Sequence, residues 1–221
     1  MTQEVTQTIV HMLRHGEVHN PTGVLYGRIP GFKLSDRGQQ QALTVAEHLA
    51  DRDIVHVVAS PLERAQQTAT PIASSHRLDL ATDPDLIEAD NKFEGLKVAV
   101  GDGALRSPRH WSKLVNPFRP SWGEPYADIA KRMRAAIADA REAARGHEAV
   151  IVSHQLPVWI ARRSYEGKTF VHDPRKRQCS LASITSLTFD DDHFDGFTYS
   201  EPAGHLLPDE LKSGKKFVGG A

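Results

Sequence analysis

The sequence contains a single cysteine and no long hydrophobic run, and both shortages restrict what the protein can be. One cysteine, Cys179, cannot form an intrachain disulfide, which is typical of proteins in a reducing compartment. The chain has no start of the signal-peptide type and no apolar stretch near the roughly 20 residues that a membrane helix needs. We therefore expect a cytoplasmic protein that has no membrane partner.

Neither sign of charge is in excess. Lys and Arg together number 27 and Asp and Glu 28, so the net charge is −1 with neutral histidines. A surface that binds nucleic acid through its phosphates normally needs a clustered basic excess, so we expect no nucleic-acid partner. A domain usually has roughly 100–200 residues, which predicts a single domain over 1–221. The sequence leaves open whether this domain forms a homodimer.

Short apolar runs rich in Val and Ile predict the strands of the protein. Runs of this length are too short for an independent helix and are typical of buried parallel strands. They occupy residues 8–13, 55–60 and 149–154, and a further strand is expected over 183–189. Segments with helical character lie between them. This alternation predicts an α/β fold of three layers, with helices on both sides of a mostly parallel central sheet.

Capping residues predict where the helices begin. Ser35 is expected to be the N-cap of a helix that follows the first strand. After the second strand, Ser60, Pro61 and Glu63 are spaced like an N-cap, a first-turn proline and a capping-box glutamate. A further helix, rich in Ala and Arg, is predicted over 128–144.

Two segments depart from this alternation. Residues 90–125 are rich in Gly, Pro, Lys, Arg and Trp, and we interpret them as an inserted cap or lid that selects the substrate. Beyond about residue 200, the content of Pro, Gly and Lys predicts an extended or partly disordered tail.

Reactive polar residues accompany three predicted strands at their carboxyl ends. The first strand ends at Arg14 and His15, and the third ends at His154. The second strand lies just before Arg64. Ligands of open α/β sheets bind outside the carboxyl ends of the strands, so these side chains should meet. Arginine grips phosphate oxygens in pairs, a neutral imidazole can attack phosphorus, and a second, protonated histidine can stabilise the transferring oxygens. The sequence therefore predicts an anion site with a built-in nucleophile.

The spacing of His11, His15 and His19, four residues apart, raises the alternative of a metal site. Three histidines at this spacing share one face only on a continuous helix. The run 8–13 is strand-like, and Gly16 interrupts any helix. We therefore predict no metal here and interpret His11 and His19 as ordinary strand and loop residues.

Five ordered motifs resemble the histidine phosphatase superfamily, also called phosphoglycerate mutase-like proteins. Together they cover roughly residues 8–190, and their order and spacing make the resemblance far more specific than an isolated RHG. The motifs are LRHGE at 13–17 with Asn20 after it, LSDRGQQQA at 34–42, ASPLERAQQTA at 59–69, LIEADNKFEG at 86–95 and IVSHQLPVW at 151–159.

The resemblance implies a role for each residue that matches the family's pattern. His15 would be the nucleophile that becomes phosphohistidine. Glu88 would protonate the leaving group and afterwards activate water. Arg14, Arg64 and His154 would hold the phosphoryl oxygens.

The same resemblance points to residues that would lie against the substrate. Asn20 would line the site, and Gly16 would let the backbone turn tightly so that the His15 ring faces the pocket. Gln155 stands where the family usually has glycine. Its backbone N–H is kept, but its side chain would project into or beside the phosphate site. Arg28 is a further candidate for substrate binding.

The implied activity is that of a metal-independent phosphomonoesterase that needs no cofactor and acts on a small phosphorylated metabolite. Two alternatives stay open: phosphoryl transfer of the phosphoglycerate mutase type, and a phosphate-binding module without catalysis. The insert lacks the ERHYG-like segment of the glycolytic mutases, which favours hydrolysis. The motif at 86–95 is one residue shorter than the usual pattern and lacks its tryptophan, so Glu94 is the alternative to Glu88 as proton donor.

Overall fold

The computed structural model describes residues 6–96 and 123–208, which are built on a six-stranded sheet. From one edge to the other the strands are β3 (Leu80–Thr82), β2 (Ile54–Ala59), β4 (Glu148–Ser153), β1 (Gln7–Arg14), β5 (Ile184–Asp190) and β6 (His193–Ser200). The first four run parallel, whereas β5 is antiparallel to β1 and β6 to β5. The predicted α/β fold with a mostly parallel central sheet is confirmed.

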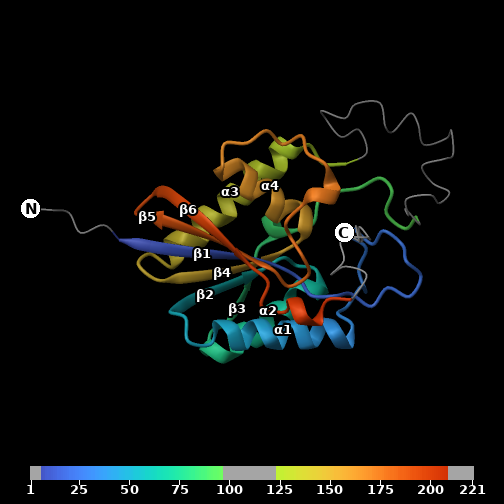
Figure 1. Ribbon diagram of the computed structural model, residues 1–221, viewed down its shortest axis with the longest axis horizontal. Coiled ribbons are helices and arrows are strands. Elements are labelled where there is room, and N and C mark those ends of the chain that lie inside the picture. The colour runs from blue at the N-terminus through green and yellow to red at the C-terminus, as the bar shows by residue number, and fades with distance from the viewer. Residues whose placement is uncertain (1–5, 97–122, 209–221) are drawn as a thin grey trace, which may run out of the picture.

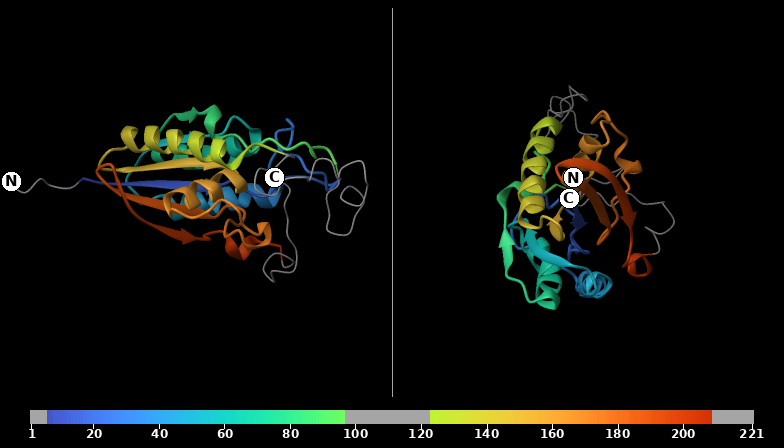
Figure 2. Two further views of the ribbon diagram at one scale, coloured as in Figure 1. Left: turned by 90° about the horizontal axis from the view of Figure 1, so that it is seen from above. Right: turned by 90° about the vertical axis from the view of Figure 1, so that its left-hand side faces the viewer.

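Helices cover both faces of the sheet (Figure 1, Figure 2). The helices are α1 (Asp36–Leu49), α2 (Glu63–His76), α3 (Tyr126–Ala143) and α4 (Gln155–Tyr165). Side chains of a strand alternate between the two faces. Along β4, Ala149 and Ile151 therefore pack in the core shared with α3 and α4. Val150 and Val152 pack in the opposite core with α1 and α2. Burial on both faces explains why β4 reads as an unbroken apolar run.

The capping prediction is confirmed for α1. The helix follows Ser35, whose side-chain oxygen accepts a hydrogen bond of 3.0 Å from the backbone N–H of Gly38. This satisfies one of the donors that a helix leaves unpaired at its N-terminus. The helix predicted over 128–144 is observed as α3, which begins two residues earlier, directly after Pro125.

The capping prediction is wrong for α2. The helix begins at Glu63 with Leu62 as its N-cap, and no side chain caps it. The Ser60 hydroxyl instead forms a 2.8 Å hydrogen bond with Nε2 of His154. The Glu63 carboxylate accepts a hydrogen bond of 2.6 Å from the backbone N–H of Gly31. Tertiary partners, which local spacing does not reveal, have therefore replaced the local capping pattern.

The sequence interpretation overlooked the edge strand β6, which follows β5 in a tight antiparallel pair. Its side chains are mostly exposed or half-buried, so it has no apolar run. The described part of the predicted tail, 201–208, contains a short 3-10 helix, and Ala203 and Leu207 are buried. Most of the predicted lid and the end of the tail lie outside the described residues. In 6–96 and 123–208, no helix is long and apolar enough to span a membrane.

Candidate phosphoryl-transfer site

Parallel pairing of β1 with β4 places the two predicted histidines side by side. The last pair of the register joins Arg14 to Ser153, so His15 and His154 are the next residues on adjacent strands. The backbone N–H of His15 donates to the Ser153 carbonyl at 3.1 Å, which extends the ladder by one bond. The two imidazole rings consequently lie with their centroids 5.1 Å apart. Residues about 140 positions apart in the chain thus form one site.

The His15 ring is fully buried and has a defined tautomer. Nδ1 lies 2.7 Å from the carbonyl oxygen of Gly16. A carbonyl can only accept, so Nδ1 carries the proton and Nε2 keeps its lone pair. Burial lowers the pKa of His15 well below its usual value, and the charges of Arg64 and Arg14 lower it further. A neutral imidazole with a free Nε2 is a competent nucleophile.

Gly16 is needed at its position for a different reason from the tight turn expected from the sequence. A Cβ at this residue would lie 2.7 Å from the carbonyl oxygen of Gly38, at the start of α1. The backbone N–H of Gly16 donates to Oγ1 of Thr68 in α2 at 3.1 Å. The glycine therefore permits close packing of the His15 segment between two helices. No substrate contact is needed to explain it, and its predicted role in substrate binding stays a prediction.

Arg14 and Arg64 bring two buried guanidinium groups to the site. Arg14 donates to the carbonyl of Cys179 at 2.8 Å, and Arg64 donates to the carbonyl of Gly27 at 2.6 Å. The Arg64 guanidinium also lies over the ring of Tyr26, 4.7 Å from its centroid. Neither arginine is ion-paired with a carboxylate in the described part of the chain, although most other arginines are. Two buried cations held by neutral partners form a site suited to an anion.

The His154 ring is also fully buried and neutral in character. Its Nε2 interacts with the Ser60 hydroxyl, and its Nδ1 is buried without a hydrogen bond to any described residue. Burial lowers the pKa of His154 well below its usual value, and Arg64 and His15 act in the same direction. A dianionic phosphoryl group next to the ring would oppose this shift. Protonation of His154, as the sequence interpretation expects, therefore depends on the charge of the bound group.

Burial makes the Glu88 carboxyl a weaker acid than an ordinary glutamate. It is 1% exposed, and its Oε1 accepts a hydrogen bond of 2.8 Å from the backbone N–H of Ala89. Burial raises the pKa of Glu88, while this hydrogen bond and the charges of Arg64 and Arg14 lower it less strongly. The protonated form of Glu88 therefore persists to higher pH than that of an ordinary glutamate. This suits a general acid.

The five predicted catalytic residues share one further property. Each has a buried polar side-chain atom that makes no hydrogen bond to any other described residue. These atoms are Arg14 Nε, His15 Nε2, Arg64 Nε, Glu88 Oε2 and His154 Nδ1. Buried polar atoms are nearly always paired in folded proteins, because leaving one unpaired costs about 1–3 kcal/mol. A cluster of such atoms at one sheet edge indicates a binding site for a polar group.

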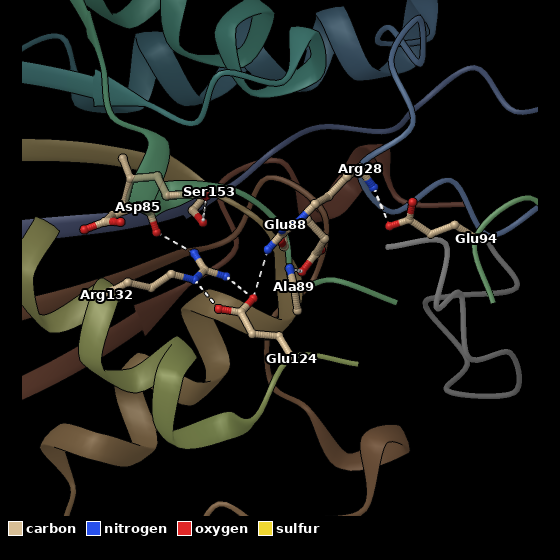
Figure 3. A network of polar contacts seen from close by, with 9 residues as sticks. Arg28, Asp85, Glu88, Ala89, Glu94, Glu124, Arg132 and Ser153 are labelled. Atoms are coloured by element: carbon tan, nitrogen blue, oxygen red, sulfur yellow. Dashed lines mark hydrogen bonds and ion pairs between the residues drawn. The ribbon is translucent and has the colours of Figure 1, made fainter. Parts of the chain in front are cut away.

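A network of ion pairs holds the segment that carries Glu88 (Figure 3). Nε of Arg28 donates to the Glu88 carbonyl at 2.6 Å, and Nη2 of Arg28 donates to the Glu124 carboxylate at 3.0 Å. The Glu124 carboxylate also binds Arg132 of α3 through both oxygens, at 2.8 and 3.1 Å. Arg132 in turn donates to the carbonyl of Asp85. The turn that carries Glu88 is thus fixed on both sides.

The substrate-binding candidates have local structural roles. The Asn20 side chain bridges to the backbone of Val24 and so closes its own loop. Arg28 belongs to the network around Glu88, and its backbone N–H donates to Glu94 at 2.8 Å. The Gln155 amide contacts the Cys179 carbonyl at 3.5 Å, beside the bond from Arg14. Contact of Asn20, Arg28 and Gln155 with a substrate stays a prediction.

Sequence reasoning missed three residues that shape the site. Tyr26 lies under Arg64, Ser60 orients His154, and Arg177 donates to Oε1 of Gln155 at 3.4 Å. The serine carried a signal, since it directly follows a strand, but the capping pattern gave it another interpretation. Tyr26 and Arg177 lie in irregular segments where spacing predicts no side-chain direction.

The helices on both faces of the sheet and the site at the carboxyl edge of its parallel strands define a three-layer α/β/α protein. The model of the histidine phosphatase superfamily, branch 1, matches residues 10–200. The chain belongs to this family, which confirms the resemblance seen in the sequence.

The chain is similar to several known proteins. The chain is 61% identical over 197 residues to the uncharacterized protein Rv0525 of Mycobacterium tuberculosis, covering 89% of this chain and 98% of the relative. It is 31% identical over 183 residues to the probable phosphoglycerate mutase GpmB of Yersinia enterocolitica, covering 79% and 83%. The mycobacterial glucosyl-3-phosphoglycerate phosphatase Rv2419c has the same fold, with a TM-score of 0.71 at 24% identity over 88% of this chain and 98% of that one.

Arg64→Lys tests whether the arginine binds phosphate or only a structural neighbour. Lysine keeps the charge but loses the planar fork that binds two oxygens at once. We expect kcat/KM for a phosphomonoester to fall about 10–100-fold, as for loss of a charge-assisted hydrogen bond, and vanadate inhibition to weaken similarly. Arg37→Lys, at an exposed arginine paired with Glu17, is the matched control. An unstable Arg64 variant whose folded fraction has normal kinetics would make Arg64 structural.

Proposed function

We propose that the protein is a metal-independent phosphomonoesterase of the cytoplasm that acts on a small phosphorylated metabolite through phosphohistidine. The observation that supports this most is the cluster of unpaired buried atoms on Arg14, His15, Arg64, Glu88 and His154. It combines a nucleophile, an acid and cationic groups for oxygens in one place. The single cysteine is the basis for proposing a reducing compartment.

The reaction follows from the tautomer of His15 and the protonation of Glu88. In the first step, Nε2 of His15 forms a bond to phosphorus while the bond from phosphorus to the leaving oxygen breaks. Glu88 donates its proton to that oxygen, so a neutral alcohol departs. In the second step water attacks phosphorus, the Glu88 carboxylate takes a proton from the water, and the nitrogen–phosphorus bond breaks. Inorganic phosphate leaves, and His15 and Glu88 return to their starting forms.

Cationic side chains supply the charge stabilisation that a metal ion supplies in other phosphoryl-transfer sites. Arg14 and Arg64 are buried, which strengthens their interaction with the equatorial oxygens of the transferring group. His154 adds a hydrogen-bond donor, and its proton becomes favourable as phosphoryl charge approaches. Positioning and electrostatics of this kind provide most of the catalysis in phosphoryl transfer.

Phosphoglycerate mutase-type transfer is the second candidate. The observation that favours it is the 31% identity to a relative described as a probable phosphoglycerate mutase. The solved structure described as a glucosyl-3-phosphoglycerate phosphatase is 24% identical to this chain. At this identity it shows a shared fold and does not decide between hydrolysis and transfer. A mutase must return the phosphoryl group to an alcohol, whereas a phosphatase must admit water to the phosphohistidine.

A hydrolysis screen over phosphorylated metabolites in the presence of EDTA tests the proposal. We expect release of inorganic phosphate at a rate that the chelator does not reduce. Product analysis by phosphorus NMR on 2- and 3-phosphoglycerate separates the two candidates, because a mutase interconverts them with little free phosphate. Activity that disappears with EDTA and returns with a divalent metal would contradict the metal-independent mechanism. Phosphate binding without any turnover would leave only the non-catalytic alternative.

A further inference from the structure

Ser60 is a buried residue beside the site whose hydroxyl has no part in the proposed reaction. It directly follows β2, and its backbone N–H donates to the Val152 carbonyl at 2.9 Å, which extends the pairing of β2 with β4. His154 directly follows β4 in the same way. The Ser60 carbonyl accepts a hydrogen bond of 2.7 Å from Nε2 of Gln66 in α2. Strand pairing and α2 therefore fix Ser60 next to the His154 ring.

The Ser60 hydroxyl has two partners. Its oxygen accepts from the backbone N–H of Leu62 at 3.4 Å, and it lies 2.8 Å from Nε2 of His154. It forms no other hydrogen bond with residues 6–96 or 123–208. Because an N–H of the backbone can only donate, the hydroxyl hydrogen has a single acceptor in this part of the chain, the lone pair of Nε2.

The hydrogen between Ser60 and His154 can lie on either atom, and the two arrangements differ in what they leave unpaired. If Nε2 donated to the hydroxyl, the hydroxyl hydrogen would be buried without an acceptor, and Nδ1 would be a buried acceptor without a donor. If the hydroxyl donates to Nε2, both of these atoms are satisfied and only an Nδ1–H is left over. Buried polar groups without partners are unfavourable, so the second arrangement is preferred.

Burial and cationic neighbours keep the His154 ring neutral before a phosphoryl group binds. Burial is the main reason that the pKa of His154 lies well below its usual value. The charges of Arg64 in α2, Arg14 in β1 and Arg132 in α3 lower it further. The adjacent His15 ring acts in the same direction. A neutral imidazole carries one N–H, so the position of that hydrogen decides which edge of the ring can donate.

The two histidines of the site would then share one tautomer and have opposite roles. Because Ser60 occupies Nε2 of His154, any hydrogen bond from this ring to a phosphoryl group has to come from Nδ1. His15 also carries its hydrogen on Nδ1, where the Gly16 carbonyl accepts it, and its free atom is the Nε2 lone pair. His15 can therefore attack phosphorus, while His154 donates to the phosphoryl oxygens.

We propose that Ser60 is a positioning residue that donates to Nε2 of His154 and so holds a hydrogen on Nδ1 for the phosphoryl oxygens. The inference rests on the proposed function, because it takes the bound group to be a phosphoryl group next to His15. It explains how the buried His154 ring offers a hydrogen bond before it takes up any second proton.

Nitrogen-15 NMR of protein with labelled histidine rings measures the tautomer, because protonated and unprotonated ring nitrogens resonate in separate ranges. The His154 signals are assigned by their absence in His154→Asn. At about pH 8, above the pKa of an ordinary histidine, the wild-type ring should have a protonated Nδ1 and an unprotonated Nε2. In Ser60→Ala the hydrogen should move largely to Nε2, the site that a free imidazole side chain prefers. Ser60→Thr keeps a hydroxyl and should keep the wild-type pattern.

Calorimetric titration with inorganic phosphate measures the contribution of this tautomer without turnover. Ser60→Ala should raise the Kd of phosphate about 3–10-fold, the usual worth of one hydrogen bond. Ser60→Thr should restore the Kd to within about twofold of the wild-type value. A merely structural role of Ser60 would change the stability of the fold but not the tautomer of His154.

Ser153→Ala is the matched control, because Ser153 is also buried, directly precedes His154 and donates its hydroxyl hydrogen to the Leu86 carbonyl at 2.7 Å. It should leave the His154 tautomer unchanged. A protonated Nε2 in the neutral wild-type ring would overturn the proposal, and so would a Ser60→Ala variant with the wild-type tautomer or the wild-type Kd. If Ser60→Ala does not fold, Ser60→Cys, whose thiol is a weak donor, provides the same comparison. Phosphate binding that depends on Ser60, without hydrolysis of any ester, would refute the phosphatase and keep this inference.

Discussion

Replacement of His15 by alanine should abolish both turnover and the covalent phosphoenzyme. The variant keeps the arginines but has no nitrogen to attack phosphorus, and water in its place would lack the position that Nε2 has. Loss of a nucleophile of this kind typically lowers kcat by several orders of magnitude, about 10⁴–10⁶-fold in comparable covalent enzymes. Rapid quenching with ³²P-labelled substrate should trap a label on the wild type that is labile in acid and stable in alkali, as a phosphoramidate is.

The matched control for this experiment is His19→Ala. His19 is exposed and lies four residues further along the same segment, so its loss should change neither the label nor the rate. His11 is a poorer control, because its ring contacts Ser186 and Glu148 at 2.7 Å inside the sheet. Full activity of His15→Ala, or a label that persists on another residue, would show that the nucleophile has been assigned to the wrong side chain.

Glu88→Gln should slow the first chemical step according to how basic the leaving oxygen is. Glutamine keeps the shape and the acceptor for the Ala89 N–H but has no proton to transfer. General acid catalysis is worth about 10²–10⁴-fold. We expect a burst rate constant lower by roughly this factor for an alkyl or sugar phosphate, and far less for p-nitrophenyl phosphate, whose leaving group needs no proton. Steady-state rates must be measured separately, since the same residue activates water in the second step.

The pH dependence of the burst gives a second measure of the same role. Because burial raises the pKa of Glu88, the acid form persists at higher pH than in a free glutamate. The burst rate constant for an alkyl phosphate should therefore fall as pH rises through this raised pKa, and the fall should be missing in Glu88→Gln. Glu94→Gln is the control, because its amide oxygen can still accept the Arg28 N–H. If Glu88→Gln instead lowers the burst rate constant equally for the alkyl phosphate and for p-nitrophenyl phosphate, Glu88 only shapes the pocket. Glu94 would then be the next candidate for the proton donor.

The accuracy of the sequence predictions depended on how local the determining interactions are. Ser35 was predicted correctly as an N-cap because a serine side chain and the third N–H after it are close in any helix start. Ser60 and Glu63 have equally good spacing, but His154 and Gly31 compete for them from distant parts of the chain. The sequence contains these partners without indicating that they are near. Edge strand β6 was missed because a solvent-exposed strand needs no apolar run.

The sequence by itself determined the apolar strands β1, β2, β4 and β5, the class of fold, the family and which residues are candidates for chemistry. Strands that are buried on both faces appear as apolar runs, and the residues at strand ends appear as family motifs. Both are contiguous in the sequence, so both can be found without the structure. The tertiary structure decided the tautomer of His15, the raised pKa of Glu88 and the pairing of Ser60 with His154. These properties arise from burial and from partners that approach across the sheet. Electrostatic effects of that kind depend on distance and desolvation in space, which spacing along the chain does not encode.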